Sequence, residues 1–180
     1  GGEVETGTVV TVSKEGTTTI EYFSLDAVGN TEATRTATVR IDDTAPMTIS
    51  NAASSYVGTA TITLTPSDTF SGVASTHWSI DGSAWTTGTV VQVPTVGSHT
   101  LEFYSIDDVG NVEAAGSADF AVLARYEQTD SLLAYTGGWL TANNASFSGG
   151  SYKYVNVAAR VDIAFEGTRI DWIAVKAASF

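Results

Sequence analysis

The sequence contains no cysteine among its 180 residues, which excludes disulfide frameworks, zinc–thiolate sites, thiol nucleophiles and iron–sulfur clusters. Basic residues are also scarce, because eight Lys and Arg stand against 20 Asp and Glu, for a formal net charge of −12. That charge argues against binding nucleic acid or anionic lipid through phosphate neutralisation. No apolar run approaches the roughly 20 residues of a membrane span, so we also expect no membrane insertion.

The acidic charge is confined to one part of the chain. Residues 1–124 hold 15 acids and three bases, whereas residues 125–180 hold five of each. Such a step in composition indicates a domain boundary near residue 124.

An internal repeat organises the acidic part. Residues 6–42 align without a gap on residues 87–123, at an offset of 81, with 17 of 37 positions identical. The repeated segments alternate apolar and polar residues with period two, which is typical of half-buried strands. Residues 114–135 could pass for a helix on spacing alone, but the β-branched counterpart 33–41 favours a strand through about Val122.

Each repeat carries one Asp-x-Val-Gly-Asn turn, at Asp26–Asn30 and at Asp107–Asn111. We expect Gly29 and Gly110 to adopt positive φ, and the leading Asp to accept backbone N–H bonds across the turn.

The central part of the chain has a recognisable series of motifs, at Asp68–Val73, Trp78–Gly82, Trp85, Gly97–Phe103 and Asp107–Asn111. This series resembles the Ig-like repeats of large secreted and surface proteins of bacteria and archaea. It implies a β-sandwich that acts mainly as an extracellular spacer. Residues 125–180 do not continue the repeat and instead resemble the opening half of carbohydrate-binding, jelly-roll-like sandwiches.

The fold class we expect is therefore all-β, with tandem Ig-like β-sandwich repeats followed by a second, jelly-roll-like β-sandwich. The domains would be residues 1–44, the C-terminal half of a repeat; 45–124, a complete repeat; and 125–180, the N-terminal part of the second sandwich. We expect the core of the complete repeat to include Ile62, Leu64, Trp78, Ile80, Leu101, Phe103, Phe120 and Val122. The two terminal segments should bury their apolar faces against something outside themselves, either a longer chain, which the resemblance favours, or neighbouring copies by strand donation.

Calcium is the metal that this composition would suit, since it takes six to eight oxygen ligands. The candidate ligands are Asp42, Asp43, Asp107, Asp108, Asn111 and Glu113. Turn acids that only brace the backbone explain the same pattern, so both interpretations stay open.

Carbohydrate binding would use aromatic faces beside polar groups. The candidates are Trp139, Tyr135 and Tyr152, and Trp139 follows two glycines in a stretch that we expect to be exposed. Trp172 lies between apolar residues of an expected strand and is predicted to be core.

No nucleophile-and-base pattern, phosphate loop or His-Glu-x-x-His motif occurs in the sequence, and we expect no catalysis. The function we expect is a non-catalytic spacer or presentation module at a cell surface or on a secreted protein. The alternatives are a module that binds surface or matrix polysaccharide and a subunit that assembles with copies of itself.

Overall fold

The computed structural model describes residues 6–164 and 170–171. The fold is all-β, as predicted, and the one helical element among these residues is the short 3-10 turn η1 (Ser148–Gly150). The chain divides into two compact units, residues 1–124 and 125–180, and each is described by itself.

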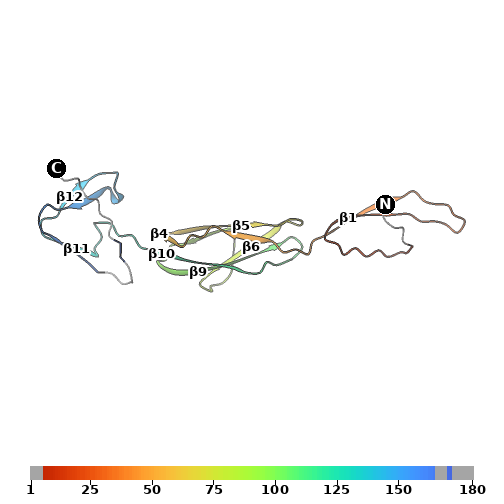
Figure 1. The fold of residues 1–180 in the computed structure, drawn as a ribbon, viewed down its shortest axis with the longest axis horizontal. Helices are drawn as coiled ribbons and strands as arrows, with labels where there is room; N and C mark the ends of the chain where they lie inside the picture. Colours follow the sequence, from red (N-terminus) through yellow and green to blue (C-terminus); the bar gives the residue numbers. More distant parts are fainter. Residues whose placement is uncertain (1–5, 165–169, 172–180) are drawn as a thin grey trace. The chain divides into compact units, whose positions relative to one another are not determined.

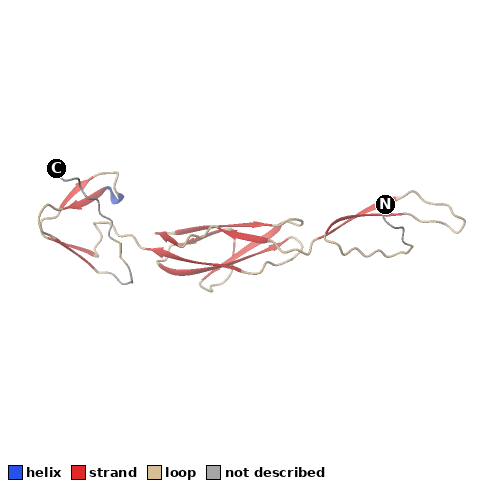
Figure 2. Ribbon diagram, in the orientation of Figure 1, coloured by secondary structure: helices blue, strands red, loops and turns tan. Residues whose placement is uncertain are grey.

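Two sheets form a sandwich within the first unit (Figures 1 and 2). The smaller sheet has the strand order β3-β5-β8, formed by Met47–Ser50, Ala60–Ser67 and Val90–Val93. The larger has the order β4-β10-β9-β6-β7, formed by Ser55–Val57, Gly116–Leu123, Gly97–Asp107, Val73–Ile80 and Thr86–Thr87. All neighbouring strands are antiparallel except β4 and β10, which run parallel.

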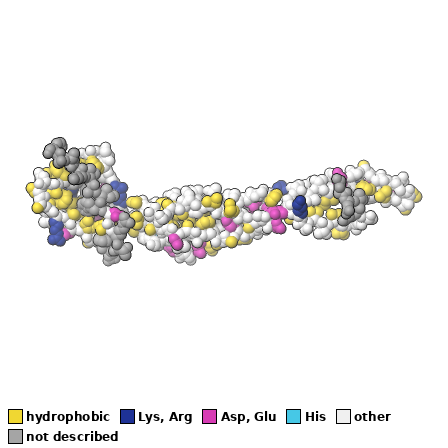
Figure 3. All heavy atoms as spheres, in the orientation of Figure 1, with side chains coloured by type: hydrophobic (Ala, Val, Ile, Leu, Met, Phe, Trp, Pro, Cys, Tyr) yellow, Lys and Arg dark blue, Asp and Glu magenta, His cyan; other side chains and the backbone are white. Residues whose placement is uncertain are grey.

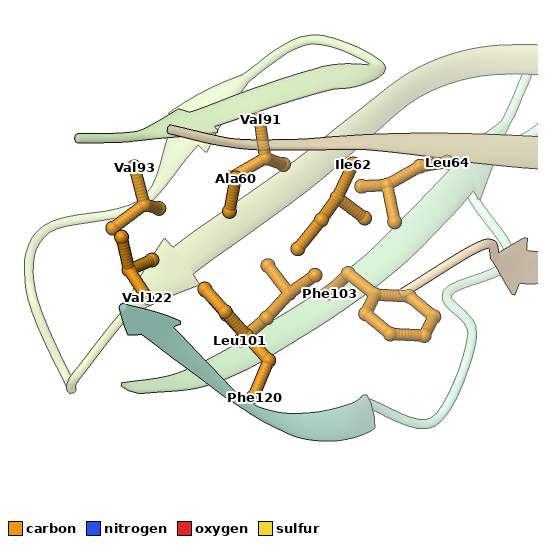
Figure 4. Packing of buried hydrophobic residues seen from close by; sticks show 9 residues of the cluster. All are labelled: Ala60, Ile62, Leu64, Val91, Val93, Leu101, Phe103, Phe120 and Val122. Atoms are coloured by element: carbon orange, nitrogen blue, oxygen red, sulfur yellow. The ribbon is translucent and has the colours of Figure 1, made fainter. Parts of the chain in front are cut away.

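The core of the sandwich consists of the inward-facing residues of both sheets (Figure 4). Alternation puts every second residue of β5 and β9 inside, because successive side chains of a strand point to opposite faces. The buried residues are Ala60, Ile62, Leu64, Val91, Val93, Leu101, Phe103, Phe120 and Val122. Trp78 and Ile80 are partly buried against them, so the predicted core is confirmed. Each large side chain contributes about 1.5–3 kcal/mol when it is fully buried.

The repeat is visible in the backbone of the same unit. Strands β1 (Gly16–Tyr22) and β2 (Arg35–Ile41) pair antiparallel, with Gly16 opposite Ile41 and Tyr22 opposite Arg35. Strands β9 and β10 have the same register at the offset of 81. The pair β1–β2 forms a two-stranded sheet of its own, to which no other described strand is hydrogen-bonded.

The second unit contains two separate antiparallel pairs. Strand β11 (Leu133–Thr136) pairs with β14 (Arg160–Ile163), and β12 (Leu140–Asn143) pairs with β13 (Ser151–Tyr154). Trp172, predicted to be a core residue, lies outside the described residues.

Candidate functional site

The two Asp-x-Val-Gly-Asn turns have the same conformation. Gly29 and Gly110 adopt φ values of 94° and 101°, a region that side chains with a Cβ rarely enter. In the first turn, Oδ1 of Asp26 accepts the backbone N–H groups of Val28 and Asn30 at 3.0 and 2.8 Å. The predicted turn geometry and its aspartate brace are confirmed.

In the second turn the brace is stronger. Oδ1 of Asp107 accepts the N–H groups of Val109, Gly110 and Asn111 at 2.6–3.0 Å, and Oδ2 accepts Nδ2 of Asn111 at 2.7 Å. Burial acts to raise the pKa of Asp107, but the side-chain and backbone hydrogen bonds from Asn111, Gly110 and Val109 together outweigh it and lower the pKa. The carboxylate is thus held in its charged form inside the fold.

Three carboxylates meet at the joint between the hairpin β1–β2 and the sandwich. One oxygen from each of Asp42, Asp68 and Asp107 lies within 4.8 Å of the others. Asp42 and Asp107 were candidate calcium ligands, whereas Asp68 was missed. Asp68 leads an Asx turn whose Oδ1 accepts the N–H groups of Phe70, Ser71 and Gly72, and that turn chemistry could have marked it.

The other candidate calcium ligands have different surroundings. Glu113 accepts the N–H and Oγ1 of Thr48, each at 2.6 Å, and the N–H of Ser105 at 3.0 Å, so it links β3 to β9. Asp108 is exposed, and its backbone N–H donates to the carbonyl of Gly72 at 3.2 Å. Asp43 is exposed as well.

Asn111 acts at the joint as a donor. Its Nδ2 reaches the carbonyl oxygens of Asp42 at 3.2 Å and Thr44 at 3.4 Å, in addition to Asp107. An amide nitrogen is a hydrogen-bond donor with no lone pair to offer a cation, so Nδ2 of Asn111 braces the joint and is not a calcium-ligating atom.

Further contacts close the joint around a cavity of about 260 Å³. Nη2 of Arg40 donates to the carbonyl of Phe70 at 3.0 Å, and the N–H of Ser71 donates to Oδ2 of Asp42 at 2.8 Å. The hydroxyl oxygen of Ser71 is buried and has no hydrogen-bond partner in the described part of the chain. The acidic side chains that gather at this end of the sandwich are magenta in Figure 3.

The carbohydrate-binding candidates fall into two groups in the second unit. Tyr135 and Trp139 form an edge-to-face pair with ring centroids 5.2 Å apart, and burial raises the pKa of Tyr135. Trp139 lies between exposed neighbours, as predicted, but is itself only partly exposed, and its Nε1 donates to the carbonyl of Arg160 at 3.0 Å. Tyr152 is 39% exposed and lies 6.0 Å from Tyr154, centroid to centroid.

One charged pair was not foreseen from the sequence. Nδ1 of His99 lies 2.7 Å from Oδ2 of Asp81, and Nε2 lies 2.9 Å from the carbonyl oxygen of Thr95. With an acceptor at each ring nitrogen, the imidazolium is favoured, and the hydrogen bond to Asp81 raises the pKa of His99 above its usual value. His99 corresponds to Thr18 in the first repeat, so the pair belongs to the second repeat alone.

The chain matches no model of a protein family, and no curated protein is significantly similar to it. The described residues form no helix long and apolar enough to cross a membrane.

Proposed function

We propose that the chain is a non-catalytic, extracellular spacer module, in which Ig-like repeats hold the segments on either side at a fixed separation. The observation that carries this proposal is the set of hydrogen bonds across the joint. Asn111, Ser71 and Arg40 tie the end of β2 to loops of the sandwich through four contacts of 2.8–3.4 Å. A spacer needs such a joint, because freely hinged domains set no distance.

The joint can be tested by distance measurement between two spin labels. Since the chain has no cysteine, Thr36→Cys in β2 and Thr61→Cys in β5 give unique attachment points at exposed positions. We expect a narrow distance distribution in the labelled parent and a broader one after Asn111→Ala, which removes the contacts to Asp42 and Thr44.

Asn30→Ala is the matched control. Nδ2 of Asn30 bonds its own turn aspartate at 2.6 Å, as Asn111 does, and has no contact at the joint. The spacer proposal fails if the parent distribution is already broad, or if Asn30→Ala broadens it as much as Asn111→Ala.

We also propose that the joint binds a calcium ion, and the cluster of Asp42, Asp68 and Asp107 favours this. Calcium–oxygen distances of about 2.3–2.6 Å let two ligands of one ion lie up to about 5 Å apart, which the cluster satisfies. Like charges this close repel one another, and a bound cation would add to the backbone N–H groups that already offset the repulsion. Ser71, whose backbone N–H donates to both Asp42 and Asp68, also has a buried hydroxyl oxygen without a partner in the described structure.

Thermal unfolding with calcium and with chelator tests this element. A ligand that binds only the folded state adds about 2.7 kcal/mol at 100 times its dissociation constant. We expect calcium to raise the midpoint of the parent and not that of Asp68→Asn. The control Asp119→Asn, which removes a carboxylate bonded to Thr100 outside the cluster, should keep the response. Identical melting curves of the parent in both buffers would exclude a calcium site.

The alternative function is glycan binding by the second unit, and the exposed Tyr152–Tyr154 pair favours it. Aromatic faces stack on sugar rings. Lys153, which lies between the two tyrosines in β13, has its Nζ 5.1 Å from the ring centroid of Tyr135 in β11. Binding to a polysaccharide array that is lost in Tyr152→Ala and kept in Trp78→Ala would favour this alternative. Binding equal in both variants would exclude Tyr152 as the platform.

A further inference from the structure

Within the part of the chain that the structure describes, no second sheet packs on the inward face of the hairpin β1–β2, although the same face of its repeat partner is the core of a sandwich. Leu101 and Phe103 are 0% and 7% exposed. Their counterparts at the offset of 81 are Ile20, which is only half-buried, and Tyr22, which is 47% exposed. The strand register is the same in both repeats, so the difference lies in what packs against the strands.

Glu32 on the hairpin likewise lacks the contact with a neighbouring strand that its counterpart Glu113 makes. In the second repeat, Glu113 accepts the N–H and hydroxyl of Thr48 and so fixes β3 to the sheet. Its counterpart Glu32 is exposed. The N–H of Glu32 donates to the carbonyl of Ser24 at 3.0 Å, as that of Glu113 does to Ser105. The backbone around the two glutamates therefore has the same hydrogen bond in both repeats.

A third element is unpaired. Residues 9–12 correspond to β8, whose four residues pair with β5 of the sandwich. In the first repeat these residues form no strand, and Val9 and Val10 are 84% and 62% exposed. The buried counterpart of Val10 is Val91, at 0% exposure.

We propose that the first repeat is the acceptor half of an Ig-like sandwich, and that its occupant is a segment with the strand pattern of residues 47–81. That segment holds β4 and β6, which flank β10 and β9 in the same sheet of the second repeat, and β3 and β5, which belong to the opposite sheet. Its first strand would bind Glu32 through a backbone N–H and a threonine hydroxyl, and its β5-like strand would pair with residues 9–12. In the folded second repeat this segment is already engaged, because its Ile62 and Leu64 are buried in their own core at 0% and 2% exposure.

The proposal is tested by adding the missing strands to the same chain. A second copy of residues 47–81 is fused directly before Gly1, which keeps the register because Gly1 corresponds to Gly82. Amide hydrogen exchange is then measured at residues 9–12 in the fused and parent proteins. We expect protection at these amides to rise by at least about 10³-fold in the fusion, as for a folded domain. Unchanged protection of Leu101 and Phe103 verifies that the original sandwich remains folded.

Two matched comparisons make the result specific. A fused copy that carries Ile62→Asp and Leu64→Asp should give no protection, because it offers no apolar strand. Glu32→Gln should reduce protection in the fusion, whereas Glu21→Gln, at an exposed position of β1, should not. The proposal is overturned if the fusion leaves residues 9–12 unprotected or if the Asp-bearing copy protects them equally. It is also overturned if the unfused parent gains that protection by self-association at high concentration, since a second copy would then be the occupant.

Discussion

Leu101 and Ile20 occupy the same position of the two repeats but differ in burial, and truncating each to alanine measures what the sandwich contributes. Leu101 is 0% exposed in the central strand of the larger sheet, so Leu101→Ala removes buried methyl groups and leaves a cavity. Changes of this kind lower the free energy of unfolding by about 2–5 kcal/mol. Ile20 is half-buried on an uncovered face, and Ile20→Ala should lower it by less than about 1 kcal/mol.

The assay is guanidinium unfolding of the full chain followed by circular dichroism, with calorimetry to identify the transition of the sandwich. A domain of 60–100 residues loses about 4–8 °C of midpoint for each kcal/mol. A change of about 3 kcal/mol in Leu101→Ala therefore corresponds to about 12–24 °C. The reasoning is refuted if the two variants shift the transition equally, or if Leu101→Ala changes the unfolding free energy by less than about 1 kcal/mol.

The remaining predictions concern pH and the tie between the sheets. The pKa of His99 is raised in the folded state, so the stability that it contributes is complete below its unfolded-state value of about 6.5 and is lost as the pH rises through the folded-state value. The thermal unfolding midpoint of the parent should therefore fall as the pH rises through this range, and His99→Gln should flatten this part of the plot of midpoint against pH. An equal slope in the two proteins would contradict the role of the pair with Asp81. Glu113→Ala should lower the free energy of unfolding by on the order of 3 kcal/mol, because it leaves two backbone N–H groups without their charged acceptor. Glu32→Ala should change it by less than about 0.5 kcal/mol, and equal losses in denaturant titrations of the two variants would contradict the assigned contacts.

The sequence predicted those features that depend on local periodicity. The alternation in residues 60–67 and 97–107 identifies the inward face, since period two is a property of the strand itself. The repeat of Asp-x-Val-Gly-Asn predicted both turns, because glycine and aspartate have specific roles there.

Features that depend on contacts between distant segments were not predictable in this way. Asp68 joins Asp42 and Asp107 only after the loops of different strands meet, and its counterpart in the first repeat would precede Gly1. Glu113 follows the turn so closely that it looked like part of an acidic cluster, but its side chain bonds Thr48 on the opposite sheet. Trp139 follows two glycines, and no local pattern shows that its indole N–H donates to the carbonyl of Arg160 at the start of β14.

The parallel pair β4–β10 determines how the second repeat would carry a mechanical load. Tension along the chain would pull β4 toward its N-terminal end and β10 toward its C-terminal end, because β3 and β4 are the first strands of the sandwich and β10 is the last. In a parallel pair those pulls are opposed along the strand axis, so the three residue pairs from Ser55–Ala121 to Val57–Leu123 are sheared together rather than opened one at a time. The Glu113 contacts to Thr48 hold β3, which precedes β4, against the same pull. The arrangement therefore makes the repeat resist extension at its ends more than the antiparallel hairpin β1–β2, whose pairs would separate in succession from the open end.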